Sequence, residues 1–263
     1  MRFPERLKKP LRPVRELALR LIYGRTGMPC KVNDFSFKID PSTRFSFPNC
    51  HDPEVASLVN RVLKPGMCCW NVGANVGVHT LQLANRVGPK GMVVAFEPNP
   101  HAALLLRRHV NFNDYGNRVT IVEAAVGERE GTTDFFIANS DPMGRPERPN
   151  PLLPQTTCIR VPVITLDRYL QSQSRHPDCV IMDIEGWEIG ALRGARTLLQ
   201  ADPLPLLIIE LHFNVWAWSG HSREDLETLL REHNLSVEAL SGQTDPLSQY
   251  GQVRLYRADG LAN

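Results

Sequence analysis

Residues 68–80 read CCWNVGANVGVHT, a short apolar run that passes through a glycine turn into a helix-like pattern. Gly73 and Gly77 stand four residues apart in this turn. Dinucleotide-binding folds use G-x-G-x-x-G and phosphate-binding loops use G-x-x-x-x-G-K-S/T, and neither spacing is present here. The turn therefore predicts a ligand other than a pyrophosphate, and it disfavours a nicotinamide-dependent oxidoreductase.

Beyond the turn, apolar runs without alternation are separated by segments in which apolar residues recur at helical spacing. Such runs indicate strands buried on both faces, as in a parallel sheet covered by helices. The predicted strands are residues 68–72, 92–96, 119–125, 179–184 and 206–211, and the clearest helices are 78–87, 99–113 and 222–234. The sequence thus predicts an α/β, Rossmann-like fold.

Two regions depart from this rhythm. Residues 131–140 and 158–170 are expected to form extra strands, and the proline-dense stretch 141–154 between them is expected to be a surface loop. Residues 235–241 and 251–258 are expected to pair as antiparallel strands at the edge of the sheet.

The amino-terminal region has a different character. Residues 13–23 show the pattern of a short, basic, amphipathic helix. Residues 30–50 predict a hairpin from the alternation of Phe35, Phe37 and Ile39 and then Phe45 and Phe47. We assign residues 1–50 to an N-terminal extension and 51–263 to one α/β domain. The basic helix either packs on that domain or makes a weak contact with a membrane surface.

Composition narrows the possible partners and locations. The 263 residues carry a net charge of +2, whereas nucleic-acid-binding domains usually carry a strong basic patch. No apolar run reaches the ~18 residues of a membrane-spanning helix, and the basic start lacks the features of a signal peptide.

The six cysteines contain no C-x-x-C pair and are expected to be reduced thiols, with adjacent Cys68 and Cys69 on opposite faces of their strand. No nucleic-acid partner and a cytoplasmic location are therefore expected.

The glycine turn is expected to bind part of a cofactor, because open α/β sheets bind ligands at the carboxyl ends of their strands. Gly73 presents no side chain to obstruct a ligand, and Gly77 allows the following helix to approach closely. Without a phosphate-binding lysine, the helix start at 77–80 suits a carboxylate or another polar amino-acid group, to which Thr80 can hydrogen-bond.

An acidic residue follows the second strand. Glu97 lies about twenty residues beyond the second glycine, where an acid accepts hydrogen bonds from both hydroxyls of a ribose. Pro98 ends the strand and Asn99 can cap the next helix. A ribose, an amino acid and no pyrophosphate together describe S-adenosylmethionine. The predicted cofactor-binding residues are Asn71, Gly73, Ala74, Asn75, Gly77, Thr80, Glu97, Asn99 and Asp183.

The fourth and fifth strands end in groups that can carry acid–base chemistry. Asp183 and Glu185 are two residues apart in MDIEGWE, as are Glu210 and His212 in IIELH. An acceptor that receives the cofactor's methyl group at a protonated atom must lose that proton, and His212 is the preferred general base because an unperturbed histidine titrates near neutral pH. Asp183 and Glu185 are the other predicted catalytic residues. Asp183 could instead bind the amino group of the cofactor, and His212 could instead hydrogen-bond a neighbouring loop.

Two further roles are open at this end of the sheet. Asp183, Glu185, Glu210 and His212 could bind a divalent cation. Trp216 and Trp218 either overhang the pocket, where they would suit a sugar ring, or pack as a hydrophobic lid. His51 and His79 are also expected near the cofactor.

Four segments, NVGANVGVHTLQLA (71–84), VVAFEPNP (93–100), VIMDIEGWEIGALRGA (180–195) and LLIIELH (206–212), resemble the FkbM family of S-adenosylmethionine-dependent methyltransferases in content and order. The resemblance extends over roughly residues 52–240. It implies a class I methyltransferase fold with a mostly parallel, seven-stranded sheet and helices on both faces. It also implies O-methylation of a small-molecule or carbohydrate acceptor, with sugars, glycolipids and polyketide-like natural products as the expected classes.

One position departs from the family pattern. The first motif usually has aspartate where this chain has Asn71, and an amide there loses a charge that would attract the cationic end of the cofactor. A non-catalytic binding module is therefore one alternative. A methyltransferase acting on RNA or protein is another, although the charge and the absence of an N-P-P-Y-like turn after the fourth strand disfavour RNA.

Overall fold

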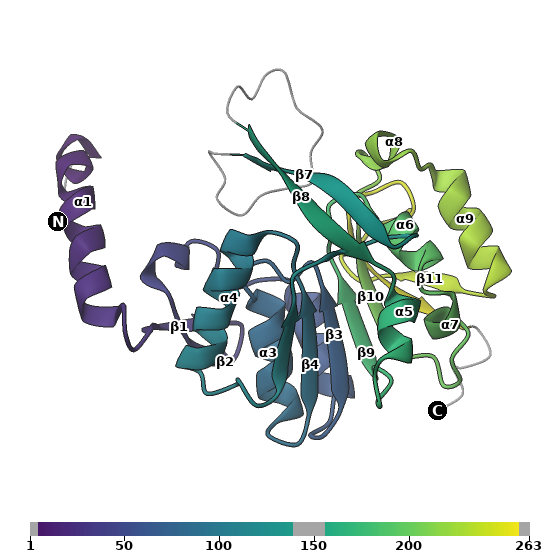
Figure 1. Cartoon of the computed structure of the whole chain (residues 1–263), viewed down its shortest axis with the longest axis horizontal. Helices are drawn as coiled ribbons and strands as arrows, with labels where there is room; N and C mark the ends of the chain where they lie inside the picture. Colours follow the sequence, from purple (N-terminus) through teal and green to yellow (C-terminus); the bar gives the residue numbers. More distant parts are fainter. Residues whose placement is uncertain (1–4, 139–155, 258–263) are drawn as a thin grey trace.

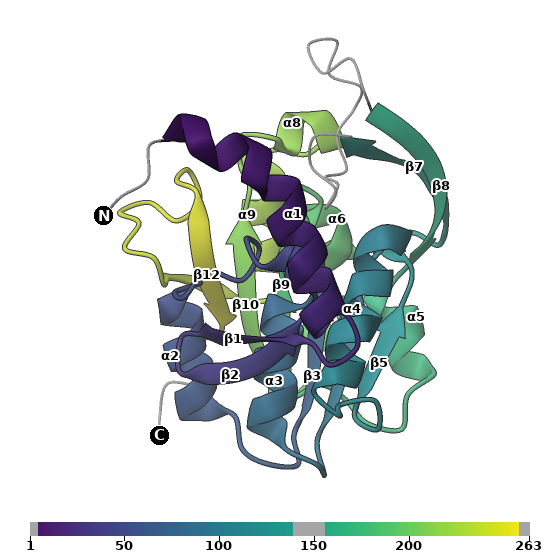
Figure 2. The ribbon, with the colours of Figure 1, turned by 90° about the vertical axis from the view of Figure 1, so that its left-hand side faces the viewer.

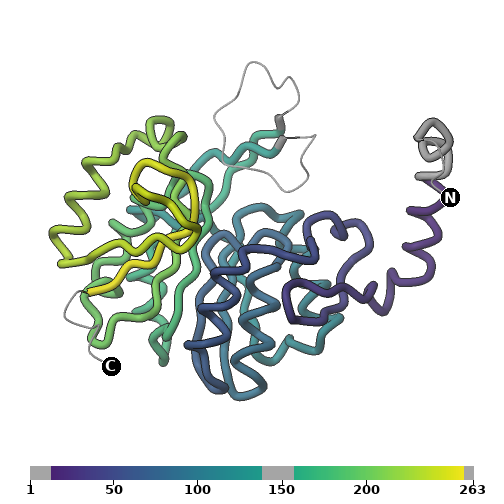
Figure 3. The backbone as a smooth tube through the Cα atoms, turned by 180° about the vertical axis from the view of Figure 1, so that it is seen from behind, coloured from purple at the N-terminus to yellow at the C-terminus, as the bar shows by residue number. Residues whose placement is uncertain are grey.

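The structure is a computed structural model that describes residues 5–138 and 156–257. The predicted proline-rich loop at 141–154 lies outside the described residues. A twisted sheet runs through the middle of the molecule with helices on either side (Figure 1). The amino-terminal helix and the last strands lie at opposite ends of the molecule (Figure 3).

The central sheet has seven strands in the order β11-β12-β10-β9-β3-β4-β5. Neighbouring strands are parallel except β12, which is antiparallel to both β10 and β11. The strands are β3 (Cys68–Val72), β4 (Met92–Phe96), β5 (Val119–Val122), β9 (Cys179–Met182), β10 (Leu206–Leu211), β11 (Ser236–Ala239) and β12 (Gly251–Tyr256). The mostly parallel, seven-stranded sheet is confirmed, and so is the antiparallel pairing of the last two strands.

Helices cover both faces of this sheet. One face carries α2 (Pro53–Val62), α3 (Val78–Val87) and α4 (Pro100–Phe112), and the other carries α5 (Leu166–Gln171), α6 (Glu188–Arg193), α7 (Arg196–Leu199) and α9 (Arg223–Glu232). A separate core lies under each set. Cys69 belongs to the first core and Cys68 to the second, as their adjacency predicts. All six cysteines are free thiols.

The sequence signals for helix starts are realised in the structure. The Asn99 side chain accepts a hydrogen bond from the His101 N–H at 3.0 Å and caps α4. Ser222 and Asp225 form a capping box at the start of α9. These caps fix where the helices begin at the carboxyl edge of the sheet.

Two predicted strands end earlier than expected. The third stops at Val122, and Ala125–Val126 forms β6 in a different sheet. The fourth stops at Met182, because Glu185 and Gly186 take positive φ angles of 54° and 105° and turn the chain. Asp183 and Glu185 therefore belong to a turn and not to the strand.

A smaller sheet stands above this edge. It has the order β6-β8-β7, with β7 at Gly131–Ala138 and β8 at Thr156–Ile164. The prediction of a strand through residue 170 is wrong. The Thr165 side chain accepts from the Arg168 N–H at 3.1 Å and starts the short helix α5 instead.

The amino-terminal segment combines a helix and a hairpin. Helix α1 spans Glu5–Tyr23, and the hairpin pairs β1 (Met28–Val32) with β2 (Phe35–Ile39). The predicted continuation through Phe45 and Phe47 is wrong, because a 3-10 turn, η1 (Pro41–Thr43), follows β2. The alternating side chains of β2 are buried against α3 and α4. In the view of Figure 2 the hairpin lies below α1. No helix among residues 5–138 and 156–257 is both long and apolar enough to cross a membrane.

Candidate active site

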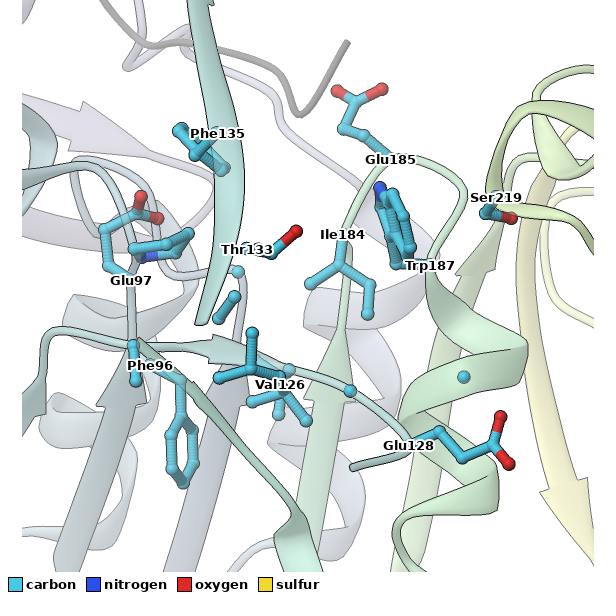
Figure 4. Close-up of a pocket in the computed structure, with 18 of the residues that line it drawn as sticks. Phe96, Glu97, Val126, Glu128, Thr133, Phe135, Ile184, Glu185, Trp187 and Ser219 are labelled. Carbon is cyan, nitrogen blue, oxygen red and sulfur yellow. The ribbon is translucent and has the colours of Figure 1, made fainter. Parts of the chain in front are cut away.

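A cavity of about 490 Å³ opens at the carboxyl ends of the central strands. Its lining includes the last residues of β3 and β4, the turn after β9, and parts of β6 and β7. Glu97 and Glu185 lie on opposite sides of the cavity in the view of Figure 4, with Phe135 above Glu97 and Trp187 below Glu185. The small sheet thus forms one wall of a pocket whose floor is the edge of the large sheet.

The glycine turn is shaped by its contacts with the rest of the protein. Gly73 has φ +83°, and a Cβ there would lie 1.7 Å from the carbonyl oxygen of Asp183. Gly77 has φ +100°, and a Cβ there would lie 2.3 Å from Leu106 Cδ1 on α4. The close approach was predicted for the helix that follows Gly77, but α4 makes it instead, through Leu106. Gly73 lines the cavity, but its lack of a side chain is required first by the end of β9.

Several predicted cofactor residues support the turn from below. Asn71 and Thr80 are buried, and the Asn71 Nδ2 donates to Thr80 Oγ1 at 2.8 Å. Neither lines the cavity, and Ala74, Gly77 and Asn99 do not line it either. Their direct contact with a cofactor stays a prediction.

Glu97 is placed as the sequence predicts, at the end of β4 and on the wall of the cavity. Its Oε2 accepts from the Asn75 N–H at 2.6 Å, and its Oε1 accepts from the Asn99 N–H at 2.8 Å. Burial raises the pKa of this carboxyl to about 7, against the lowering effect of these two hydrogen bonds. Each oxygen keeps a further lone pair that can accept from a ligand hydroxyl.

Asp183 and Glu185 lie on the opposite wall. Asp183 Oδ1 is buried and has no hydrogen-bond partner among the residues that the structure describes. Burial, together with the neighbouring carboxylates, raises the pKa of Asp183 well above its usual value. A buried oxygen without a donor is costly unless a ligand supplies one, so this atom favours a cationic or hydrogen-bond-donating group.

His212 lies just behind these carboxylates and is held by Glu188. Its Nδ1 is 2.9 Å from Glu188 Oε1, and its Nε2 is 3.4 Å from Glu185 Oε2 and 3.7 Å from Asp183 Oδ1. Burial opposes the charge on the ring, but Glu188 and the other carboxylates raise its pKa to about 9. The ring is therefore a cation at pH 7, whereas the prediction of a general base rested on the near-neutral pKa of an unperturbed histidine.

Glu188 organises this end of the site, a role that the sequence did not indicate. The side chain is fully buried and accepts from the Gly186 N–H at 2.7 Å and from Trp216 Nε1 at 3.0 Å, in addition to its contact with His212. The only available signal was an acid at the start of an otherwise apolar helix. His212 and Trp216 come from a different part of the chain, so the spacing alone could not reveal these partners.

The two tryptophans after β10 have different surroundings. Trp216 is only 2% exposed and belongs to the core, so it does not overhang the cavity. Trp218 is 49% exposed and does not line the cavity either. An indole does reach the site, but it comes from Trp187 on the turn that follows Asp183.

Three of the four predicted cation ligands come together. One ligand atom each from Asp183, Glu185 and His212 lies within 4.8 Å of the others. Glu210 is not part of this group, because its carboxylate accepts the hydroxyl of Tyr250, whose ring lies 5.4 Å from that of His212. The group could hold a divalent cation at the cavity wall.

His51 and His79 meet at a second group of potential ligands. Both rings approach Asp52 at the start of α2, and neither residue lines the cavity. The structure thus brings the two histidines to each other and not to the predicted cofactor pocket.

The strand order, the glycine turn and the acid at the end of β4 describe a class I methyltransferase site. A family model described as Methyltransferase FkbM domain matches residues 71–237. The chain belongs to the FkbM methyltransferase family. The predicted family is confirmed, and with it the coarse assignment as an S-adenosylmethionine-dependent methyltransferase.

Solved structures with a similar chain path include the following three, all of low sequence identity. A precorrin-6y C5,15-methyltransferase from Geobacter metallireducens is 16% identical, with 78% of this chain and 84% of that chain covered and a TM-score of 0.44. Fibrillarin from Aeropyrum pernix, with natively bound S-adenosyl-L-methionine, is 12% identical, with coverage of 76% and 72% and a TM-score of 0.43. An O-methyltransferase from Bacillus cereus in complex with SAH is 15% identical, with coverage of 76% and 77% and a TM-score of 0.41. No curated protein matches the sequence significantly.

Proposed function

We propose that this FkbM protein transfers the methyl group of S-adenosylmethionine to a hydroxyl oxygen of a sugar, glycolipid or natural-product acceptor. The observation that carries the proposal is that Glu97 and the Asp183–Glu185 turn line the same cavity. One wall suits a ribose, and the other supplies carboxylates for a reacting hydroxyl. The net charge of +2 supports an acceptor other than RNA.

The residues present fit the cofactor. Glu97 would accept from the ribose hydroxyls through the lone pairs that Asn75 and Asn99 leave unused. Asp183 Oδ1, which lacks a donor among the described residues, would accept from the ammonium group of the methionine moiety. A bound ammonium would favour the ionised form of Asp183, which would then supply the charge that Asn71 does not provide.

The side chains of the turn after β9 would remove the proton of the acceptor hydroxyl. S-adenosylmethionine supplies an electrophilic methyl group on a sulfonium. As the acceptor oxygen gains its bond to carbon and the carbon–sulfur bond breaks, the hydroxyl proton must leave. Glu185 lines the cavity, with its Oε2 3.4 Å from His212 Nε2, and would accept that proton. His212 then acts as a positioning cation and not as the base.

A divalent cation is the alternative means of activating the hydroxyl. Asp183, Glu185 and His212 would hold it, and His212 already has the hydrogen bond from Nδ1 to a carboxylate that is typical of metal-binding histidines. A bound cation would lower the pKa of the acceptor hydroxyl. Activity that is lost with a chelator and restored by Mg²⁺ or Mn²⁺ would support this arrangement.

Calorimetric titration with S-adenosylmethionine and S-adenosylhomocysteine tests the proposal first. Wild type, Glu97→Ala and the control Glu123→Ala should be compared, because Glu123 is an exposed acid of the same region that does not line the cavity. We expect binding that falls about 10- to 100-fold only in Glu97→Ala, the range for lost hydrogen bonds to a charged group. Failure of the wild type to bind either compound would refute the proposal. Binding without turnover of any hydroxylated acceptor would favour a non-catalytic module.

A further inference from the structure

The group formed by His51, Asp52 and His79 lies outside the cavity and has the donor set of a transition-metal site. One ligand atom from each residue lies within 4.8 Å of the others. Both imidazole Nε2 atoms face the same carboxylate oxygen, Asp52 Oδ2, at 3.3 Å for His51 and 3.1 Å for His79. Ligands around a tetrahedral zinc ion are separated by about 3.3 Å, given bonds of about 2.0–2.1 Å.

The surroundings hold these ligands in place. The other Asp52 oxygen, Oδ1, accepts from Gln252 Nε2 at 2.9 Å, a contact of the kind that orients metal-binding carboxylates. Asn33 bonds the backbone of His51 on both sides, through its Nδ2 to the carbonyl at 2.8 Å and through its Oδ1 to the N–H at 3.2 Å. The three side chains are 12–34% exposed, so an ion from solvent can reach the group.

We propose that His51, Asp52 and His79 bind a zinc-like divalent transition-metal ion with one open coordination position. Two imidazoles and one carboxylate select Zn²⁺ or Co²⁺ over Mg²⁺ and Ca²⁺, which prefer oxygen ligands. This preference separates the site from the group at Asp183, Glu185 and His212, where two of the three ligands are carboxylates. Metal binding at His51, Asp52 and His79 does not depend on the proposed methyltransferase activity.

Titration with Co²⁺, followed by its visible absorption, and calorimetry with Zn²⁺ test the site. The experiments use a Cys50→Ser/Cys158→Ser background, because those two exposed thiols could bind either ion. We expect one ion per chain at this site, at least a tenfold loss of its affinity in His51→Ala/His79→Ala, and about a tenfold loss in Gln252→Leu. Asp183→Asn/Glu185→Gln is the matched control and should retain binding. The absence of stoichiometric binding, or equal binding by His51→Ala/His79→Ala, would overturn the proposal.

A second, independent observation concerns α1. Val14, Leu17, Leu21 and Ile22 follow helical spacing and are 60–78% exposed, so they form one apolar stripe that faces solvent. The helix is attached through its polar side, where Arg44 Nη1 donates to Glu16 Oε2 at 2.8 Å. Burying the apolar side would be the ordinary arrangement for a helix packed on a domain, and the structure has the opposite one.

The charge of the amino-terminal segment indicates which partner binds this apolar stripe. Residues 1–25 contain eight Lys or Arg and two Glu, a net charge of +6, whereas the rest of the chain carries −4. A second copy of this protein at the stripe would bring another positively charged amino-terminal segment against the first, and the two would repel each other. We infer that the apolar stripe of α1 inserts into the interface of an anionic membrane while the basic residues contact its headgroups.

Flotation with phosphatidylcholine vesicles, with and without phosphatidylglycerol, tests this surface. We expect binding only to the anionic vesicles, weakened by salt and reduced at least tenfold in Leu17→Glu/Leu21→Glu. Val62→Glu/Leu104→Glu adds the same charge at exposed apolar positions elsewhere and should bind as wild type does. Absence of binding, or equal binding by Leu17→Glu/Leu21→Glu, would overturn the inference. A wild-type dimer that this variant converts to a monomer, without lipid binding, would assign the stripe to a second copy and also overturn it.

Discussion

Glu97 couples the proposed cofactor contact to pH. Its pKa of about 7 means that the carboxylate form, which accepts from two hydroxyls, is lost as pH falls below neutrality. We expect the affinity for S-adenosylhomocysteine to fall by up to about tenfold per pH unit below pH 7, with a plateau above it. Calorimetry between about pH 5 and 8 measures this dependence.

Glu97→Gln provides the control for that profile. The amide keeps the size of the side chain but does not titrate, so its affinity should be lower than that of wild type at pH 8 and closer to it at pH 5. A ratio of the two affinities that is constant with pH would show that Glu97 is not the titrating group.

Glu188 is the residue whose loss should cost most stability. Glu188→Ala leaves the His212 cation and the Trp216 N–H buried without their acceptor. We expect about 3–5 kcal/mol less free energy of unfolding, as for a broken buried ion pair, measured by urea denaturation. Glu185→Ala, a partly exposed acid of the same turn, should change it by less than about 1 kcal/mol. Equal losses in the two variants would contradict this role for Glu188.

The positions of site residues that directly follow a strand could be predicted from the sequence. Glu97 follows β4 directly, so its place at the cavity could be read from the sequence. The protonation of His212 could not, because it depends on Glu188, which is 24 residues away and reaches it only in the folded chain. Trp216 was ambiguous for the same reason, since the acceptor that satisfies its buried N–H is also Glu188.

At the scale of elements, the packing of the glycine turn against α4 depends on Gly77. An alanine there must adopt φ +100° and place its Cβ 2.3 Å from the fully buried Leu106. Gly66→Ala is a matched control, because its φ is +93° and nothing lies within 4 Å of the added Cβ. We expect Gly66→Ala to cost about 1–2 kcal/mol and Gly77→Ala about 1–3 kcal/mol more.

Thermal or urea unfolding of the two glycine variants measures this difference. It isolates the contact with Leu106, because the backbone strain is common to both positions. Equal destabilisation would mean that α4 moves aside without cost and that the glycine is needed only for the turn.

Burial on both faces made the interior strands predictable, whereas their ends depended on local turns. Cys68–Val72 is buried at every position, and its apolar run has the length of the strand. The end of β9 is set by positive φ at Glu185, which is uncommon for a glutamate and has no sequence signal. The hairpin was predicted from alternation, but the turn at Pro41–Thr43 ended that alternation before Phe45.

At the scale of the whole molecule, the hairpin β1–β2 completes the core although it precedes the matched family segment. Val32, Phe37, Ile39 and Phe47 are at most 3% exposed and belong to the core under α2, α3 and α4. We expect a chain without residues 1–24 to unfold cooperatively within a few degrees of the full chain. A chain without residues 1–50 should lose the cooperative transition, because it exposes this core.

Calorimetric scans of the two truncated chains test this expectation. Cooperative unfolding of the shorter chain would place the domain boundary at residue 50, as the sequence indicated. Its loss would move the boundary to the start of the hairpin.

The position of β12 has a consequence for how the protein is made. β12 is the last of the seven strands along the chain, yet it lies between β10 and β11 and pairs with both. While the ribosome is still synthesising that strand, β10 has an open edge and β11 has no neighbour to join. The nascent protein must therefore complete its sheet late, by inserting a final strand between two earlier ones. We expect this interval to be the one in which the unfinished chain is most exposed to aggregation and most dependent on chaperones.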